Sequence, residues 1–108
     1  MQAFKNPIGA LEFEIVQEQA SALGRQGRRL EAALAALRAF DAEPRDHAAP
    51  GSEPHGRRES LVAEAGEALW YLLVQRDACR LHNSVTVITH YAVPREVVNR
   101  LGPAARPL

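Results

Sequence analysis

Residues 13–37 read FEIVQEQASALGRQGRRLEAALAAL, and the positions of their apolar repeat alternate in steps of three and four. The repeat positions are Phe13, Val16, Ala20, Leu23, Gly27, Leu30, Leu34 and Leu37. This spacing is typical of the a/d seam of a helix that packs lengthwise against another helix. The pattern therefore predicts a helical architecture, and it suggests that the chain does not work alone.

Composition restricts the class of protein. The chain has 108 residues, 13 basic and 13 acidic, and a formal net charge of zero, so it forms one domain at most and lacks the basic excess of a general nucleic-acid binder. The longest apolar run, residues 68–74, is far shorter than the roughly 20 residues that span a bilayer. The N-terminal residues lack a signal-peptide pattern, and one cysteine allows no intrachain disulfide framework. We expect a cytoplasmic protein with neither nucleic-acid nor membrane partners.

The first helix is predicted from Pro7 to about Phe40, with Asn6 as its N-cap and Pro7 at the first helical position. Gly24 and Gly27 interrupt the pattern, and each costs about 1 kcal/mol relative to alanine in a helix interior. Either the helix kinks there or a neighbouring backbone approaches closely. We expect a continuous helix, because the heptad phase is the same on both sides of the glycines.

A second helix is predicted from about Arg57 to His82, preceded by a proline- and glycine-containing linker at residues 41–56. The linker lacks apolar periodicity and is expected to be mobile. It is long enough for the second helix to fold back antiparallel to the first. Within this helix, residues 69–74 are apolar on every side, which is typical of a helix buried on more than one face.

The C-terminal part is predicted to be short and mixed. Residues 85–91 are rich in β-branched side chains and predict a strand, which would pair with its symmetry mate or with residues 2–5. Residues 94–101 predict a short helix that begins at proline and ends before Gly102. The tail, residues 103–108, is expected to fray.

These elements expose more apolar surface than one chain can cover. A first helix of about 34 residues is about 50 Å long, whereas the second covers only about 39 Å of it. A second apolar stripe also runs along the first helix through Ile8, Leu11, Ile15 and Ala22. The predicted fold is therefore mainly α, a hairpin of two long antiparallel helices that a second copy completes as a four-helix bundle. The predicted interface residues are Phe13, Val16, Leu23, Leu30, Leu34, Leu37, Leu69, Trp70 and Leu73.

Chemical motifs are sparse. Cys79 and His82 are three residues apart on one predicted helix, so the thiol and the imidazole could meet, but no third orienting group is indicated. The pair supplies two zinc ligands where four are usual, and His90 could join only in space. The sequence contains no Glu-x-x-His motif of a di-metal bundle enzyme. We therefore assign no catalytic, cofactor-binding or metal-binding residue and expect no cofactor.

Two charged clusters have simple interpretations. Arg25, Arg28 and Arg29 could bind a phosphate or an acidic partner, but a solvated helix face is the simpler explanation. Three glutamates of the second helix are likewise predicted to lie on a solvated face: Glu59, Glu64 and Glu67. His47 and His55 lie in the predicted linker and are expected to be exposed.

Three functional hypotheses follow. The leading one is a homo-oligomeric helical protein, most simply a homodimer, with an interaction or scaffolding role. The second is a small enzyme, or a ligand or metal binder, whose pocket at a subunit interface contains Trp70, Tyr71, Cys79, His82 and His90. The third is a regulatory partner that binds a different, unidentified protein through the same seam.

Three segments carry a resemblance to a known family. They are NPI at residues 6–8, LWYLLVQR at residues 69–76 and YAVPREV at residues 91–97. With them the chain resembles a small bacterial family of uncharacterised helical proteins, over most of its length except the linker. The resemblance implies a helical architecture and no particular activity.

Overall fold

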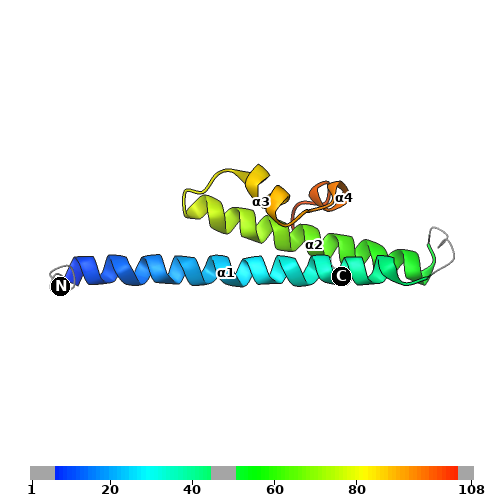
Figure 1. The fold of residues 1–108 in the computed structure, drawn as a ribbon, viewed down its shortest axis with the longest axis horizontal. Helices are drawn as coiled ribbons and strands as arrows, with labels where there is room; N and C mark the ends of the chain where they lie inside the picture. The colour runs from blue at the N-terminus through cyan, green and yellow to red at the C-terminus, as the bar shows by residue number, and fades with distance from the viewer. Residues whose placement is uncertain (1–6, 45–50, 105–108) are drawn as a thin grey trace.

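The computed structural model describes residues 7–44 and 51–104, with side chains described from residue 9 onward. It contains α1 (Pro7–Ala42), α2 (Glu53–Ala78), α3 (Ser84–His90) and α4 (Arg95–Val98), as Figure 1 shows. The described residues include no strand. The predicted mainly-α class, with two long helices packed together, is confirmed. The radius of gyration is 18.3 Å, whereas a compact chain of this length has about 13 Å, so the molecule is elongated.

Helix α1 is continuous over 36 residues and passes through both glycines without a break. A Cβ atom at Gly27 would lie 2.6 Å from the Tyr91 hydroxyl oxygen, so the glycine makes room for a neighbouring side chain. Gly24 meets only the flexible Arg28 side chain. The expected continuity of the helix is therefore confirmed, and the close neighbour at Gly27 is a tyrosine hydroxyl rather than backbone. The proposed cap at Asn6 lies outside the described residues.

The C-terminal half of α1 and the facing side of α2 form the core of the hairpin. Leu30, Leu34 and Leu37 of α1 have exposed fractions of 0–2%, and they belong to one buried cluster with Ala65 and Leu69 of α2. The heptad seam is thus used, over this half of α1, to pack the two helices of one chain. Burial of each leucine side chain stabilises the hairpin by about 1.5–3 kcal/mol.

Helix α2 begins at Glu53, four residues earlier than predicted, because Ser52 caps it. The Ser52 hydroxyl accepts a hydrogen bond from the backbone N–H of His55 at 3.3 Å, and Pro54 occupies the first turn, where its missing N–H has no cost. The segment between the long helices is therefore shorter than the predicted linker at 41–56. Its residues 45–50, including His47, lie outside the described residues, and its mobility stays a prediction.

Helix α2 ends at Ala78, four residues before the predicted end, in a Schellman motif. The Leu81 N–H donates to the Arg76 carbonyl at 2.8 Å, and the Arg80 N–H donates to the Asp77 carbonyl at 2.9 Å. Arg80 adopts φ 64°, a left-handed conformation that this motif requires and that usually favours glycine.

The strand predicted at residues 85–91 is wrong, because these residues form α3. Asn83 caps the helix by accepting the Thr86 N–H at 3.3 Å. Val85 is 67% exposed whereas Val87 is 3% exposed, so residues two apart face different environments, as in a helix rather than on one face of a strand. The proposed pairing of this segment with a symmetry mate or with residues 2–5 is no longer needed; residues 2–5 lie outside the described residues.

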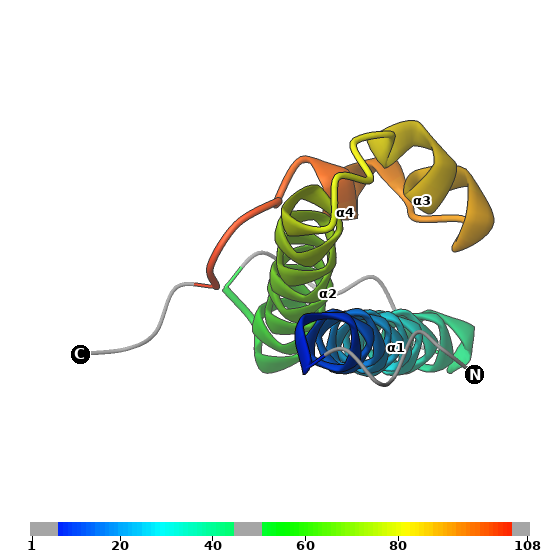
Figure 2. The same cartoon turned by 90° about the vertical axis from the view of Figure 1, so that its left-hand side faces the viewer.

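The C-terminal segment packs on α2, which lies between α1 and α4 in Figure 2. The predicted short helix is present, but it spans only Arg95–Val98. Val97 is completely buried, and Gly66 lets the Arg100 carbonyl group approach α2 closely. The end of the predicted frayed tail, residues 105–108, lies outside the described residues.

Candidate interaction surface

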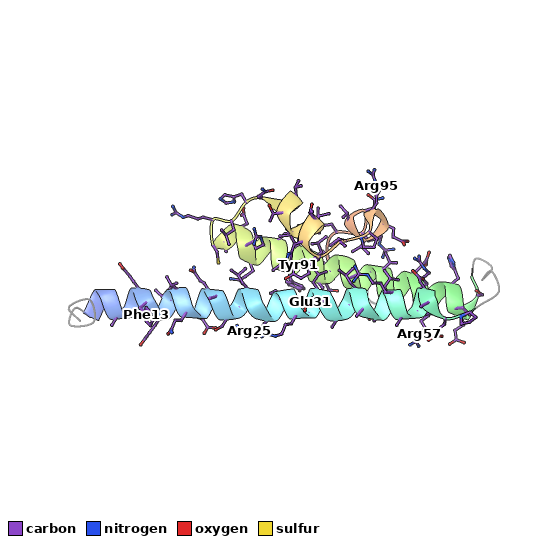
Figure 3. The ribbon with its side chains drawn as sticks, in the orientation of Figure 1. Phe13, Arg25, Glu31, Arg57, Tyr91 and Arg95 are labelled. Carbon is purple, nitrogen blue, oxygen red and sulfur yellow. The ribbon has the colours of Figure 1, made fainter. Side chains whose placement is uncertain are left out.

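The N-terminal part of α1 projects beyond the end of α2 (Figure 1). We call residues 9–22 the arm; none of its side chains is buried. Leu11, Phe13, Ile15 and Val16 are 57%, 48%, 50% and 61% exposed. Figure 3 places Phe13 on this projecting part, away from α3 and α4. A group of large apolar side chains at this level of exposure on one segment is a candidate binding surface.

The arm is apolar on two sides. Phe13 and Val16 continue the seam that Leu30 begins, beyond the point where α2 ends. Leu11 and Ile15 are exposed on nearly the opposite side of the helix, because each residue advances about 100° around the axis. A helix with apolar residues on two sides is typically covered by more than one neighbour, so the arm has surface available for partner helices.

Charge is unevenly distributed along α1. Residues 9–24 contain three glutamates, Glu12, Glu14 and Glu18, and no lysine or arginine. Three arginines follow within residues 25–29, and Arg25 forms an ion pair with Glu18 at 3.3 Å. The acidic arm therefore adjoins a basic stretch at the point where α2 begins to cover α1.

The predicted interface residues separate into two groups. Leu30, Leu34, Leu37 and Leu69 lie in the core of the hairpin, so they hold one chain together. The remaining five are accessible to a partner to different degrees. Phe13 and Val16 are exposed, and the half-buried ones are Leu23, Trp70 and Leu73. The surface that a second chain could reach is therefore concentrated on the arm and the nearby side of α2.

The residues of the second hypothesis make separate contacts. The rings of Trp70 and Tyr71 contact each other in a tilted arrangement, with centroids 5.1 Å apart and an interplanar angle of 54°. His82 pairs with the Asp77 carboxylate through Nδ1, and the Cys79 sulfur accepts from the Gln75 amide nitrogen at 3.8 Å. The fifth residue, His90, contacts the Tyr91 ring edge-on.

A pocket of about 330 Å³ at the C-terminal end of α2 has His82 in its wall, but none of the other four. It is lined by Leu73, Val74, Asp77, Leu81, His82 and Ser84. Across residues 7–44 and 51–104, no three histidine, cysteine, aspartate or glutamate side chains are grouped so that they could hold a metal ion.

An arginine at the start of α2 links three helices. Arg58 Nε donates to Asp41 of α1 at 2.8 Å, and its Nη2 donates to Glu96 of α4 at 2.7 Å. The hydrogen bond and charge of Arg58 lower the pKa of the Glu96 carboxyl, and both acidic groups raise the pKa of Arg58. Sequence reasoning did not identify this group, because its members are far apart in the chain and share no motif.

Glu67 is a second residue that the sequence analysis placed wrongly. It is 5% exposed, rather than solvated as predicted. Its Oε2 accepts the backbone N–H of Ala104 at 3.0 Å, and its Oε1 lies 3.5 Å from Arg29 Nη2. The Arg29 guanidinium also lies over the Tyr71 ring at 4.9 Å from its centroid. Arg29, one member of the arginine cluster, thus joins α1 to α2. The only sequence signal for the burial of Glu67 was its small neighbours, Gly66 and Ala68.

None of the helices in the described ranges is both long enough and apolar enough to cross a membrane. The chain matches, over residues 4–107, a family described as a family of unknown function (DUF6665). The match confirms the predicted resemblance to a family of helical proteins without an assigned activity. No curated protein and no solved structure matches the chain.

Proposed function

The chain belongs to DUF6665, a family of unknown function, and we propose that it acts as a self-associating helical protein with an interaction or scaffolding role. In this proposal two copies associate through their arms and form a homodimer. The observation that supports it is the exposure of Leu11, Ile15 and Val16 on α1, which continues past the end of α2. We place this assembly in the cytoplasm, because the single cysteine allows no disulfide framework of the kind that stabilises small secreted domains.

The arm suits association because it is not needed for the core of the hairpin. The buried cluster begins at Leu30 on α1, with Leu23 packed against its edge. Residues 9–22 contribute no buried side chain. Large exposed apolar side chains that are grouped on one segment often mark an interaction site, so their presence on the arm supports a role in binding rather than in folding.

The expected affinity can be estimated from the four large apolar residues on each arm. Completing the burial of all eight half-exposed side chains would yield about 6–12 kcal/mol, which is an upper bound because one partner helix covers only one of the two apolar sides of an arm. Association costs at least about 4 kcal/mol in lost translational and rotational freedom. The difference is at most about 8 kcal/mol, which corresponds to a dissociation constant no tighter than about 1 μM, so the assembly must be tested over a wide concentration range.

Sedimentation velocity from about 5 to 500 μM tests the proposal, with the range set by the affinity estimate above. The wild-type chain is expected to become dimeric as concentration rises, and Val16→Glu is expected to remain monomeric. The matched control is Val85→Glu, the same substitution at a site of similar exposure, 67% against 61%. A wild-type chain that is monomeric throughout refutes self-association in this concentration range, and equal behaviour of the two variants refutes a role for the arm.

A further inference from the structure

We propose that the pocket at the C-terminal end of α2 binds a small primary alkylamine in its protonated form. This inference concerns a free small molecule and is independent of the proposed self-association. The pocket has a volume of about 330 Å³, at the lower end of the range for small-molecule sites, and it lies where α2 ends and α3 begins (Figure 1). Three aliphatic and three polar side chains form its wall: Leu73, Val74 and Leu81, and Asp77, His82 and Ser84.

The polar half of the pocket offers hydrogen-bond acceptors. Nδ1 of His82 is paired with a carboxylate oxygen of Asp77. A carboxylate can only accept, and a neutral imidazole carries one proton on one of its two nitrogens. In a neutral His82 ring that proton is therefore on Nδ1, where it is donated to Asp77, and Nε2 is left as an acceptor. Together with the second Asp77 oxygen and the Ser84 hydroxyl oxygen, the pocket presents three acceptors to a ligand.

These acceptors fit an ammonium group in number and in charge. Within residues 7–44 and 51–104, neither Nε2 of His82 nor the Ser84 hydroxyl has a hydrogen-bond partner. The Asp77 carboxylate adds a negative charge, and no lysine or arginine is part of the wall. A primary ammonium group has three N–H donors, no acceptor and a positive charge. An anionic head group would instead meet the like charge of Asp77.

The apolar half of the pocket fits an aliphatic body. Val74 and Leu81 are 50% and 44% exposed, and Leu73 is half-buried. These side chains therefore present apolar surface that a ligand can cover. Each methylene group that leaves water should tighten binding about fourfold, so the affinity for an alkylamine should increase with chain length until the pocket is filled.

The segment between α2 and α3 is fixed at both ends. The Leu81 N–H donates to the Arg76 carbonyl at 2.8 Å, and the Asn83 side chain accepts the Thr86 N–H at 3.3 Å. The lining residues of this segment are therefore in place before a ligand arrives. A site whose groups are already positioned loses less conformational freedom on binding.

Helix α2 also contains a matched pair of residues outside the pocket. Nε2 of His55 lies 3.2 Å from a Glu59 carboxylate oxygen, and neither residue lines this pocket. The side chains of both histidine–carboxylate pairs are at least 38% exposed, so an amine can reach either. Binding that the two pairs share reports on the ion pair alone, and any difference between them reports on the pocket.

NMR titration of the full chain with ethylamine, propylamine and butylamine tests the proposal. The measurement is made at about pH 8.5, above the range in which histidine usually titrates and where alkylamines keep their charge, as lysine does. The His82 ring and the Leu81 methyl groups should shift and saturate, whereas the His55 ring should not. The dissociation constant should fall about fourfold for each added methylene, and butanol and butyrate should bind at least about tenfold more weakly than butylamine.

Three variants assign the binding to the pocket. Asp77→Asn keeps the shape of the side chain but removes its charge, and it should weaken butylamine binding at least about tenfold. The matched control, Glu59→Gln, should leave it unchanged. Leu81→Ala should reduce the gain for each methylene, and it keeps the test decisive if circular dichroism shows that Asp77→Asn disturbs the fold.

Four results overturn the proposal. Equal shifts of His55 and His82 indicate a property of any histidine–carboxylate pair. An affinity that is independent of chain length excludes the apolar wall, and butanol binding as tightly as butylamine excludes recognition of the ammonium group. Tighter binding of Nα-acetyl-lysine methylamide than of butylamine assigns the site to a lysine of another protein rather than to a free amine. The absence of a saturable shift up to about 0.1 M butylamine excludes the site altogether.

Discussion

Gly66 lies where α2 meets the backbone of the C-terminal segment, and we expect Gly66→Ala to destabilise the chain although alanine favours helices. A Cβ atom at this position would lie 2.3 Å from the Arg100 carbonyl oxygen and 2.9 Å from its carbon. Ordinary carbon contacts are about 3.5–4.0 Å, so the backbone at Arg100 must move by about 1 Å. Because this group is backbone, the movement carries the neighbouring residues of α4 with it.

The magnitude follows from three contributions. Alanine improves the helix by about 1 kcal/mol relative to glycine, whereas overpacking of a well-packed contact costs about 1–3 kcal/mol. Displacement of α4 also exposes part of Val97, whose complete burial is worth about 1.5–3 kcal/mol. The expected net loss in the free energy of unfolding is about 1–3 kcal/mol, by the same principles.

The control is Gly24→Ala on α1, where the nearest group is Nη1 of the flexible Arg28 side chain at 3.2 Å. This variant should be more stable than wild type by up to about 1 kcal/mol. Urea unfolding followed by circular dichroism measures both, at one fixed concentration because association shifts apparent stability. Amide exchange should be faster at residues 95–104 in Gly66→Ala alone. The reasoning is refuted if Gly66→Ala is as stable as Gly24→Ala.

Three further variants test individual contacts. Ala92 has φ 51°, so Ala92→Gly should relieve left-handed strain and raise the free energy of unfolding by about 0.5–1 kcal/mol in thermal melts; a lower melting temperature contradicts this. Gly27→Ala should displace the Tyr91 ring while the stability changes by less than about 1 kcal/mol, and an unchanged Tyr91 ring NMR spectrum would contradict it. Glu96→Gln should cost less than about 1 kcal/mol at pH 7, because the ion pair with Arg58 is partly exposed. Since this pair lowers the pKa of Glu96, its stabilisation is present above the usual glutamate pKa and is lost as pH falls through the lowered value. The difference between Glu96→Gln and wild type should therefore shrink in acid, and a difference that grows with acidity would be inconsistent with the ion pair.

The long helices could be predicted because their signals are local and repeated. The seam from Phe13 to Leu37 keeps one heptad phase over several turns. Because this phase is the same before and after the two glycines, the sequence predicted a continuous helix. The predicted ends of α2 were less accurate, because each differed by four residues from the observed end. Ser52 with Pro54 was a readable cap, but the prolines around it resembled a linker, and the left-handed turn at Arg80 has no glycine to mark it.

The error at residues 85–91 has a physical cause. β-branched residues fit strands because of the surfaces they pack against, and their preference depends strongly on context. Here the Asn83 side chain accepts the Thr86 N–H in the first turn of the helix. Val87 is buried, so one face of the helix packs against the rest of the chain. A short segment offers too few residues for the helical period to be distinguished from alternation, so the tertiary contact decided its structure.

The tertiary groups were beyond sequence reasoning for a different reason. Arg58, Asp41 and Glu96 come from three helices, and only the packed structure brings them within hydrogen-bonding distance. The same holds for Glu67, whose burial depends on the C-terminal segment crossing beside Gly66. Helical position predicted that Glu67 could be exposed, but it could not reveal which later segment would cover it.

The arm presents a conflict that the monomer alone does not resolve. A short helix that buries none of its side chains is marginal in water, and exposed apolar side chains add a tendency to aggregate. The arm combines both properties, since it is helical from Pro7 onward and contributes no buried side chain over residues 9–22. A second arm packed along the seam would remove both difficulties at once, because it buries Val16 and supplies the tertiary contacts that hold the helix. The heptad repeat therefore has two uses along one helix: from Leu30 onward it folds the chain, and from Phe13 to Leu23 it is available to join chains.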